Sequence, residues 1–267
     1  MKKILIPVDF SKTSENALFF TLSLFSKFPV EITVYHSFKL ASTAFHMRSI
    51  DHLLRKDAEK DMEKLIEKVK LKYPELTLKT KIIEADTESS ITRIAKRRNF
   101  DLIAMGTKGV SGLKEVFIGS VAGEVISNST VPVLVIPESA EDARIKDITI
   151  AVSKQVVSDE KTLSPLKEII HLTNSKLHVL HLTEEENLPK KFRIESLEDL
   201  QPHYIYAYCE HSIDHCINEY VDKSNSQILC LVRSKRDFFT RLITGSITTK
   251  QTFHCKVPLL ILQEHQD

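Results

Sequence analysis

The sequence predicts an α/β protein built from two tandem doubly wound domains, each with a five-stranded, mostly parallel sheet and helices on both faces. Short apolar runs of strand length alternate with segments of helical periodicity through residues 3–137, which is typical of layered α/β folds. The same succession returns in the second half, and both copies end on a strand that begins with Val-Pro, at Val131 and Val257. A length of 267 residues agrees with two domains at about 150 residues each.

In the first half, the segments between the apolar runs carry apolar residues at helical spacing, as in Ala17, Leu18 and Leu22. Pro29 and Pro74 follow two of these segments, because proline cannot continue a helix. The predicted strands are residues 3–8, 30–37, 76–84, 101–105 and 131–137, and the predicted helices cover about 11–28 and 50–69, the surroundings of Ile91, and a segment that starts at Ser120.

The second half repeats this pattern with a period of about 130 residues, far longer than a solenoid unit. A polar linker at residues 139–144 separates the copies, so we expect domains at 1–139 and 145–267. The predicted strands are residues 147–153, 176–182, 203–209, 227–232 and 257–262, with a helix at about 212–221.

Composition narrows the function classes. The net charge is +1, which provides no general attraction to nucleic acid or to an anionic membrane. No apolar run approaches the roughly 18 residues that a membrane span needs, so we expect a cytoplasmic protein. The four cysteines form no Cys-x2-Cys pair, and in a reducing compartment we expect buried, reduced thiols.

Glycine is concentrated in one loop. The chain has six glycines, and five of them lie between positions 106 and 123. This loop connects a predicted strand to a predicted helix that starts near Ser120, and a helix N-terminus offers free N–H groups to an anion. The alternative is that these glycines only serve the turn. The loop matches neither the P-loop pattern nor Gly-x-Gly-x-x-Gly. In flavodoxin-like and Rossmann-like sheets, ligands bind at the carboxyl ends of the strands, where Asp9 and Gly106 are expected to meet.

The spacing Gly-x2-Gly-x9-Gly-Ser, from Gly106, Gly109, Gly119 and Ser120, together with Pro7-Val8-Asp9, resembles the ATP-binding branch of the universal stress protein family. The resemblance implies a bound ATP, with Mg²⁺ held mostly by phosphate oxygens and water. It places the adenosine near Pro7, Val8 and Asp9, with the Asp9 carboxylate accepting from ribose hydroxyls. Asp9 could also cap the first helix, and the two roles are compatible.

The resemblance also assigns the rest of the site. Ser37 stands where the family usually has an apolar residue against adenine. Met105, Gly106, Thr107 and Gly109 would line the ribose and the phosphates. Gly119, Ser120, Val121 and Ala122 would supply backbone N–H groups and one hydroxyl to the phosphates. No second carboxylate has the spacing of a general base, so we expect slow hydrolysis or none.

The second copy lacks this site. Ser153 replaces Asp9 and Ala151 replaces Pro7, while Val232 and Lys235 fall on Gly106 and Gly109. Side chains there would crowd a phosphate, and a left-handed backbone would be costly. The pair Gly245-Ser246 persists. The basic residues of this loop, interpreted as a solvated face or alternatively as another anion site, are Arg233, Lys235, Arg236 and Arg241.

The sequence thus indicates an ATP-binding stress-response protein with one nucleotide in the first domain and a regulatory or pairing second domain. We expect the two Val-Pro strands to pair with each other within one chain. Two such chains could also associate as a homodimer. The rival hypotheses are a nucleotide-independent scaffold and a slow adenine-nucleotide hydrolase. One further candidate is a zinc site, formed by His211 and His215 with Cys209 and Cys216 nearby. The alternative is a partly exposed helix whose histidines bind no metal, and this alternative is preferred.

Overall fold

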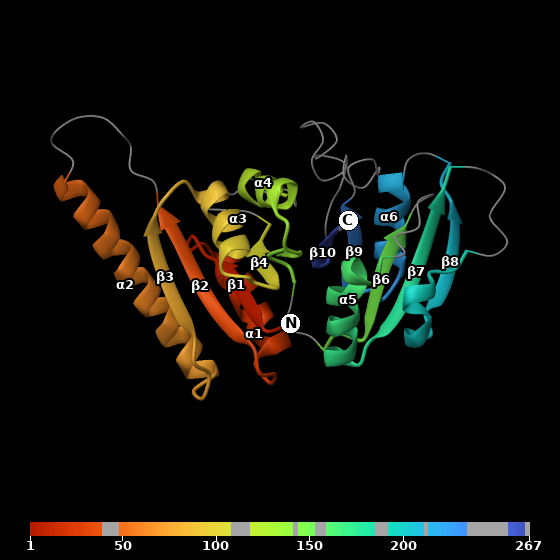
Figure 1. Cartoon of the computed structure of the whole chain (residues 1–267), viewed down its shortest axis with the longest axis horizontal. Helices are drawn as coiled ribbons and strands as arrows, with labels where there is room; N and C mark the ends of the chain where they lie inside the picture. The colour runs from red at the N-terminus through yellow and green to blue at the C-terminus, as the bar shows by residue number, and fades with distance from the viewer. Residues whose placement is uncertain are drawn as a thin grey trace.

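The protein forms one continuous ten-stranded sheet with helices on both faces (Figure 1). The computed structural model describes residues 1–38, 48–107, 118–140, 144–152, 159–184, 192–210, 213–233 and 256–264. The strand order is β3-β2-β1-β4-β5-β10-β9-β6-β7-β8, so each half contributes five consecutive strands in the same internal order. The predicted α/β fold with doubly wound, mostly parallel sheets is confirmed, and the two five-stranded sheets are joined into one.

The first half alternates strands and helices as the periodicity predicts. Its third strand starts at Lys79 rather than at residue 76, because the pairing of this strand with β2 begins at Lys79 opposite Thr33. The elements are β1 (Lys3–Pro7), α1 (Lys12–Phe25), β2 (Glu31–Phe38), α2 (Arg48–Lys72), β3 (Lys79–Glu84), α3 (Thr87–Arg97), β4 (Leu102–Gly106), α4 (Ser120–Asn128) and β5 (Val133–Ile136).

From β6 to β9, the second half repeats the order of the first half with one change. Between β7 and β8 it has the short 3-10 helix η1, where the first half has the 25-residue α2. The elements are β6 (Asp147–Val152), α5 (Glu160–Thr173), β7 (Lys176–Thr183), η1 (Glu195–Leu200), β8 (His203–Tyr208), α6 (Ile213–Lys223), β9 (Ile228–Arg233) and β10 (Leu259–Gln263).

Two hydrophobic cores lie on opposite faces of the sheet. Helices α1, α2 and α5 pack on one face, and α3, α4 and α6 pack on the other. Along β1 the side chains alternate between these cores, with Ile4 and Ile6 on the α1 face and Leu5 on the α3 face. Since α1 and α4 leave neighbouring strands β1 and β4 toward opposite faces, a crevice opens between those two strand ends, as at the switch point of doubly wound sheets.

The halves meet along their last strands, and Arg233 and the N-terminal amino group of Met1, which donates to the Glu168 carboxylate, add further contacts. Strand β5 pairs antiparallel with β10, with Leu134 opposite Leu260. Arg233, at the end of β9, donates to the backbone carbonyls of Ser127 at 2.9 Å and Ser129 at 2.8 Å. These carbonyls lie at the C-terminal end of α4, where a cation is favoured by the helix dipole. The interpretation of Arg233 as part of a solvated basic face is therefore wrong, since its guanidinium joins the two halves. The other three basic residues of that loop, Lys235, Arg236 and Arg241, lie outside the described residues.

Across the described part of the chain, no helix is long and apolar enough to cross a membrane.

Candidate functional site

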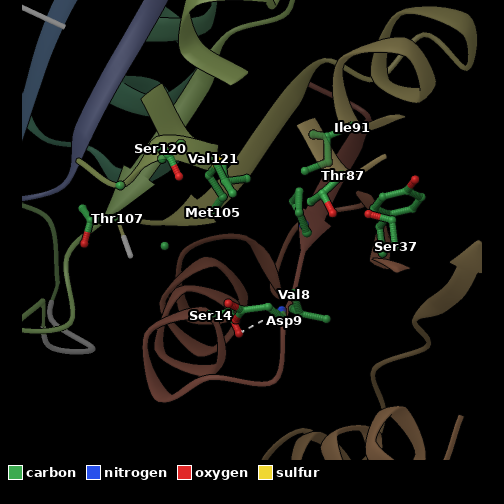
Figure 2. Close-up of a pocket in the computed structure, with 15 residues that line it drawn as sticks. Val8, Asp9, Ser14, Ser37, Thr87, Ile91, Met105, Thr107, Ser120 and Val121 are labelled. Atoms are coloured by element: carbon green, nitrogen blue, oxygen red, sulfur yellow. Dashed lines mark hydrogen bonds between the residues drawn. The ribbon is translucent and has the colours of Figure 1, made fainter. Parts of the chain in front are cut away.

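A cleft of about 360 Å³ opens at the carboxyl ends of β1 and β4 (Figure 2). Strands β1, β2 and β4 form its floor, and the first turns of α1, α3 and α4 form its walls. The volume falls in the range of about 300–1,000 Å³ that is usual for small-molecule sites. The lining residues are Pro7, Val8, Asp9, Ser14, Tyr35, Ser37, Thr87, Ile91, Met105, Gly106, Thr107, Gly119, Ser120, Val121 and Ala122.

The turn after β1 fixes the position of Asp9. The Asp9 carboxylate accepts hydrogen bonds from the backbone N–H of Ser11 at 3.1 Å and from the Ser11 hydroxyl at 2.6 Å. The backbone N–H of Asp9 donates to the hydroxyl of Ser14 at 3.3 Å. Ser11, not Asp9, is the N-cap of α1, because its hydroxyl oxygen accepts from the backbone N–H of Ser14. Asp9 thus holds the capping residue and lines the cleft at once.

Two aromatic rings support this turn from the outside. Phe10 has a left-handed backbone with φ of 62°, which allows the chain to turn sharply between Asp9 and α1. Its ring lies 4.5 Å from the His36 ring, measured between centroids. His36 in turn donates from Nδ1 to the backbone carbonyl of Val8 at 2.8 Å. The conformation of the end of β1 is therefore held by its neighbour β2.

Gly106 is needed for the packing of α1 against β4. A Cβ atom at this position would lie 2.8 Å from the Thr13 methyl carbon and 3.0 Å from the Thr13 carbonyl oxygen. None of the glycines in the described segments has a positive φ. The expectation that Gly106 supplies a left-handed backbone is therefore wrong. A side chain there would push away the first turn of α1, which carries Ser14.

The N-terminus of α4 faces the same cleft. Gly119 is the N-cap and offers no side-chain acceptor, and its own N–H donates to the Thr107 carbonyl at 2.6 Å. The N–H groups of Ser120, Val121 and Ala122 belong to the first turn, which has no intrahelical acceptors for them. The first turn also contains no acidic residue. An anion in the cleft would meet these N–H groups and the positive end of the helix dipole.

The opposite end of the cleft is formed by β2 and α3. Tyr35 and Ser37 lie on one face of β2, and Thr87 and Ile91 come from the first two turns of α3. Figure 2 shows Ser37 and Thr87 at one end, Ser120 and Thr107 at the other, and Asp9 with Ser14 below. Burial raises the pKa of the Tyr35 phenol, while the neighbouring Ser90 and Ser37 hydroxyls oppose that shift. The phenol is therefore protonated near neutral pH.

The structure brings together eleven of the twelve residues that the sequence suggested. Gly109 lies outside the described residues. Sequence reasoning missed Ser14, Tyr35, Thr87 and Ile91. Tyr35 could have been found, because it is two residues before Ser37 on a strand and so shares its face. Thr87 and Ile91 carried no such signal, since only the packing of α3 brings them to the cleft.

The family model described as the universal stress protein family matches residues 1–137. This chain belongs to the universal stress protein family. Universal stress protein YxiE of Bacillus subtilis is 31% identical over 144 residues, covering 50% of this chain and 97% of that protein. Universal stress protein MJ0531 of Methanocaldococcus jannaschii is 28% identical over 144 residues, covering 53% of this chain and 85% of that protein.

A solved structure resembles both halves together. A universal stress protein from Archaeoglobus fulgidus aligns with a TM-score of 0.73 at 21% identity, covering 99% of this chain and 97% of that chain. At this identity the likeness shows the fold. The ten-stranded arrangement of this universal stress protein thus has a counterpart among solved structures.

The second half of this universal stress protein differs at the equivalent positions. The pairing of β6 with β7 aligns Ala151 with Pro7 and His181 with His36, as the sequence repeat predicts. Val232 stands in the place of Gly106, while Ser153, Lys235 and the pair Gly245-Ser246 lie outside the described residues. The second half thus has a buried valine side chain near the end of β9, where the first half has a glycine.

The suggested zinc constellation is only partly within the described residues, because His211 lies outside them. In the described segments no group of three or more histidine, cysteine, aspartate and glutamate side chains could hold a metal ion. Cys209, Cys216 and Cys230 are free thiols, and burial raises the pKa of Cys209 to about 12.

Proposed function

We propose that the cleft binds ATP, one molecule per chain in the first half, with little or no hydrolysis. The observation that carries the proposal is that one cleft of about 360 Å³ joins an uncapped helix N-terminus to a mixed apolar and hydroxyl-bearing end. Such a cleft suits a ligand with an anionic group at one end and a flat heterocycle at the other. Three of the four glycine and serine positions that resemble the family's ATP-binding branch, Gly106, Gly119 and Ser120, line this cleft.

The parts of the nucleotide have distinct partners in this proposal. The phosphates meet the N–H groups of Ser120, Val121 and Ala122 at the first turn of α4. The ribose lies near Asp9, whose carboxylate can only accept hydrogen bonds and therefore suits ribose hydroxyls. The base lies at the far end, against Ile91 and the residues of β2.

Slow turnover follows from the polar groups of the lining. Among the described lining residues Asp9 is the one carboxylate, and it already accepts two hydrogen bonds from Ser11. These residues include no histidine, lysine or arginine. Phosphoryl transfer to water needs a positioned nucleophile and stabilisation of the developing charge. A Mg²⁺ ion, where present, would be held mainly by phosphate oxygens and water, because the Asp9 carboxylate already accepts hydrogen bonds from Ser11 and cannot by itself complete a coordination shell.

The second half has a pairing role in this proposal. Its last strand extends the sheet of the first half at β5, and Arg233 reaches the C-terminal end of α4, whose N-terminus faces the cleft. The second half thereby supports the helix that the phosphates would contact. We place this activity in the cytoplasm, and a homodimer of two such chains is compatible with it.

Calorimetric titration of the intact protein with ATP and Mg²⁺ tests the proposal, after a check for nucleotide that co-purifies. One site per chain is expected. Two sites would contradict the assignment to the first half alone. No binding, with no nucleotide carried through purification, would favour a nucleotide-independent scaffold. Steady release of phosphate that Asp9→Ala abolishes would favour a hydrolase.

Ser120→Asp separates anion binding from helix stability. A carboxylate in the first turn of α4 interacts favourably with the helix dipole, by about 0.3–1 kcal/mol, but it repels a phosphate at the same place. We expect ATP affinity to fall at least about tenfold while the unfolding midpoint without nucleotide is unchanged or higher. Ser120→Asn is the matched neutral control, and ATP affinity similar for both variants would contradict a phosphate at this helix end.

A further inference from the structure

Two buried hydroxyls in the cleft have no hydrogen-bond partner. Tyr35 is 1% exposed and Ser37 is 9% exposed, and both line the cleft from the same face of β2. The Ser37 and Ser90 hydroxyls lie near enough to the Tyr35 phenol to oppose the shift of its pKa, but neither forms a hydrogen bond with it. The Tyr35 and Ser37 hydroxyl oxygens thus have no hydrogen-bond partner, and neither oxygen is reached by solvent. A buried polar group without a partner destabilises the fold, so its presence calls for an explanation.

The fold itself does not require these hydroxyls. The register of β7 on β6 repeats that of β2 on β1, with Pro7 opposite Tyr35 in the first half and Ala151 opposite Leu180 in the second. Leu180 and Leu182 therefore occupy the places of Tyr35 and Ser37. Both leucines are fully buried. The same strand in the same fold is thus built from apolar side chains where no equivalent cleft residue is needed.

The position of the hydroxyls indicates what they would contact. They lie at the end of the cleft away from the α4 N-terminus, as Figure 2 shows for Ser37 relative to Ser120. A nucleotide with its phosphates at α4 would direct its base toward them. A hydroxyl can rotate, so it accepts from an N–H group or donates to a ring nitrogen or carbonyl oxygen.

We propose that Tyr35 and Ser37 recognise the polar edge of a bound purine at its 6-position, whether that position carries an amino or an oxo group. This inference rests on the proposed nucleotide site. It goes further by predicting that the site selects a 6-substituted purine rather than adenine alone. Neighbouring Ser90 does not compete for this role as a donor, because its hydroxyl donates to the Thr87 carbonyl at 2.8 Å.

Three triphosphates test the inference on the intact protein: ATP, inosine triphosphate and the triphosphate of purine riboside, which lacks the 6-substituent. For the wild type we expect inosine triphosphate to bind within about threefold of ATP, because rotatable hydroxyls serve either group. Purine riboside triphosphate should bind about tenfold more weakly, the order expected for one lost hydrogen bond in a buried site.

Tyr35→Phe and Ser37→Ala remove one hydroxyl each and keep the rest of the side chain. In at least one variant, the tenfold preference for ATP over purine riboside triphosphate should shrink to about twofold or less. Thermal unfolding without nucleotide distinguishes a recognition role from a structural one. Because each substitution removes an unpartnered buried hydroxyl, the midpoint should stay the same or rise.

The outcomes separate this inference from the proposed function. If ATP binds and both variants keep the wild-type preference, recognition by Tyr35 and Ser37 is overturned while the nucleotide site stands. A preference for ATP over inosine triphosphate of more than about thirtyfold would overturn it too, because rotatable hydroxyls do not discriminate that strongly. A lower unfolding midpoint in both variants would assign the hydroxyls to the fold. If no triphosphate binds, the proposed function and the inference both fail.

Discussion

Substitution of Gly106 by alanine tests how closely α1 packs on the end of β4. The added Cβ would lie 2.8 Å from the Thr13 methyl carbon, which is closer than side-chain carbons approach in folded proteins. It would also lie 3.0 Å from the Thr13 backbone oxygen, which is tighter than most such contacts. The backbone contact cannot be relieved by a rotamer change, so the first turn of α1 must shift. That turn carries Ser14, which holds the backbone of Asp9 at 3.3 Å.

The expected cost follows from overpacking. One methyl group forced into a packed interior destabilises a protein by about 1–3 kcal/mol. Thr13→Ser removes the methyl that lies at 2.8 Å and keeps a hydroxyl that can still donate to Glu138, as Thr13 does at 3.3 Å. By itself Thr13→Ser loses about 1 kcal/mol of buried methyl contact. In the double variant, the loss of stability should be smaller than the sum of the losses in the two single variants, because Thr13→Ser removes the methyl group that the new alanine would contact. A favourable coupling free energy of at least about 0.5 kcal/mol is expected.

Urea unfolding followed by circular dichroism measures these free energies, since the chain has no tryptophan to report on unfolding. Gly106→Ala should also weaken ATP binding, and Thr13→Ser should restore part of it in the double variant. Free energies that add within about 0.3 kcal/mol would refute the contact between these residues. A neutral Gly106→Ala would refute the packing argument altogether.

Three further predictions concern the cap, the contact between the halves and pH. Ser11→Ala removes the N-cap of α1 and a partner of the Asp9 carboxylate, and urea unfolding should show a loss of about 1 kcal/mol. Arg233→Met leaves the two carbonyls at the end of α4 without their charged donor, so the free energy of unfolding should fall by about 1.5–3 kcal/mol, with Arg97→Met, at an exposed arginine of α3, as a charge-matched control that loses less. Burial lowers the pKa of His181, so the unfolded chain gains a proton near pH 6.5 that the folded chain gains only at lower pH. Stability should therefore be full above pH 6.5 and fall as the pH drops toward the folded pKa, and His181→Leu should reduce this slope, which urea midpoints between pH 7.5 and 5.5 would reveal.

The amino-acid sequence by itself determined the succession of elements and the location of the site. Apolar runs and helical spacing specify strands and helices through local periodicity, and parallel strands bring their carboxyl ends to one edge of the sheet. Asp9 and Gly106 both follow such strands, so their meeting could be predicted without coordinates. The concentration of glycines between Gly106 and Gly123 marked the same edge.

Only the tertiary structure decided which side chains complete the cleft and why some residues are there. The structure shows that Gly106 is needed for close packing against Thr13 and not for a left-handed backbone. It also shows that Arg233 connects the two halves, where the sequence suggested an exposed charge. It also brought Ile91 to the cleft and left Tyr35 without a hydrogen-bond partner. Periodicity states which face of an element is buried, whereas these contacts depend on how distant segments pack in three dimensions, which no local pattern records.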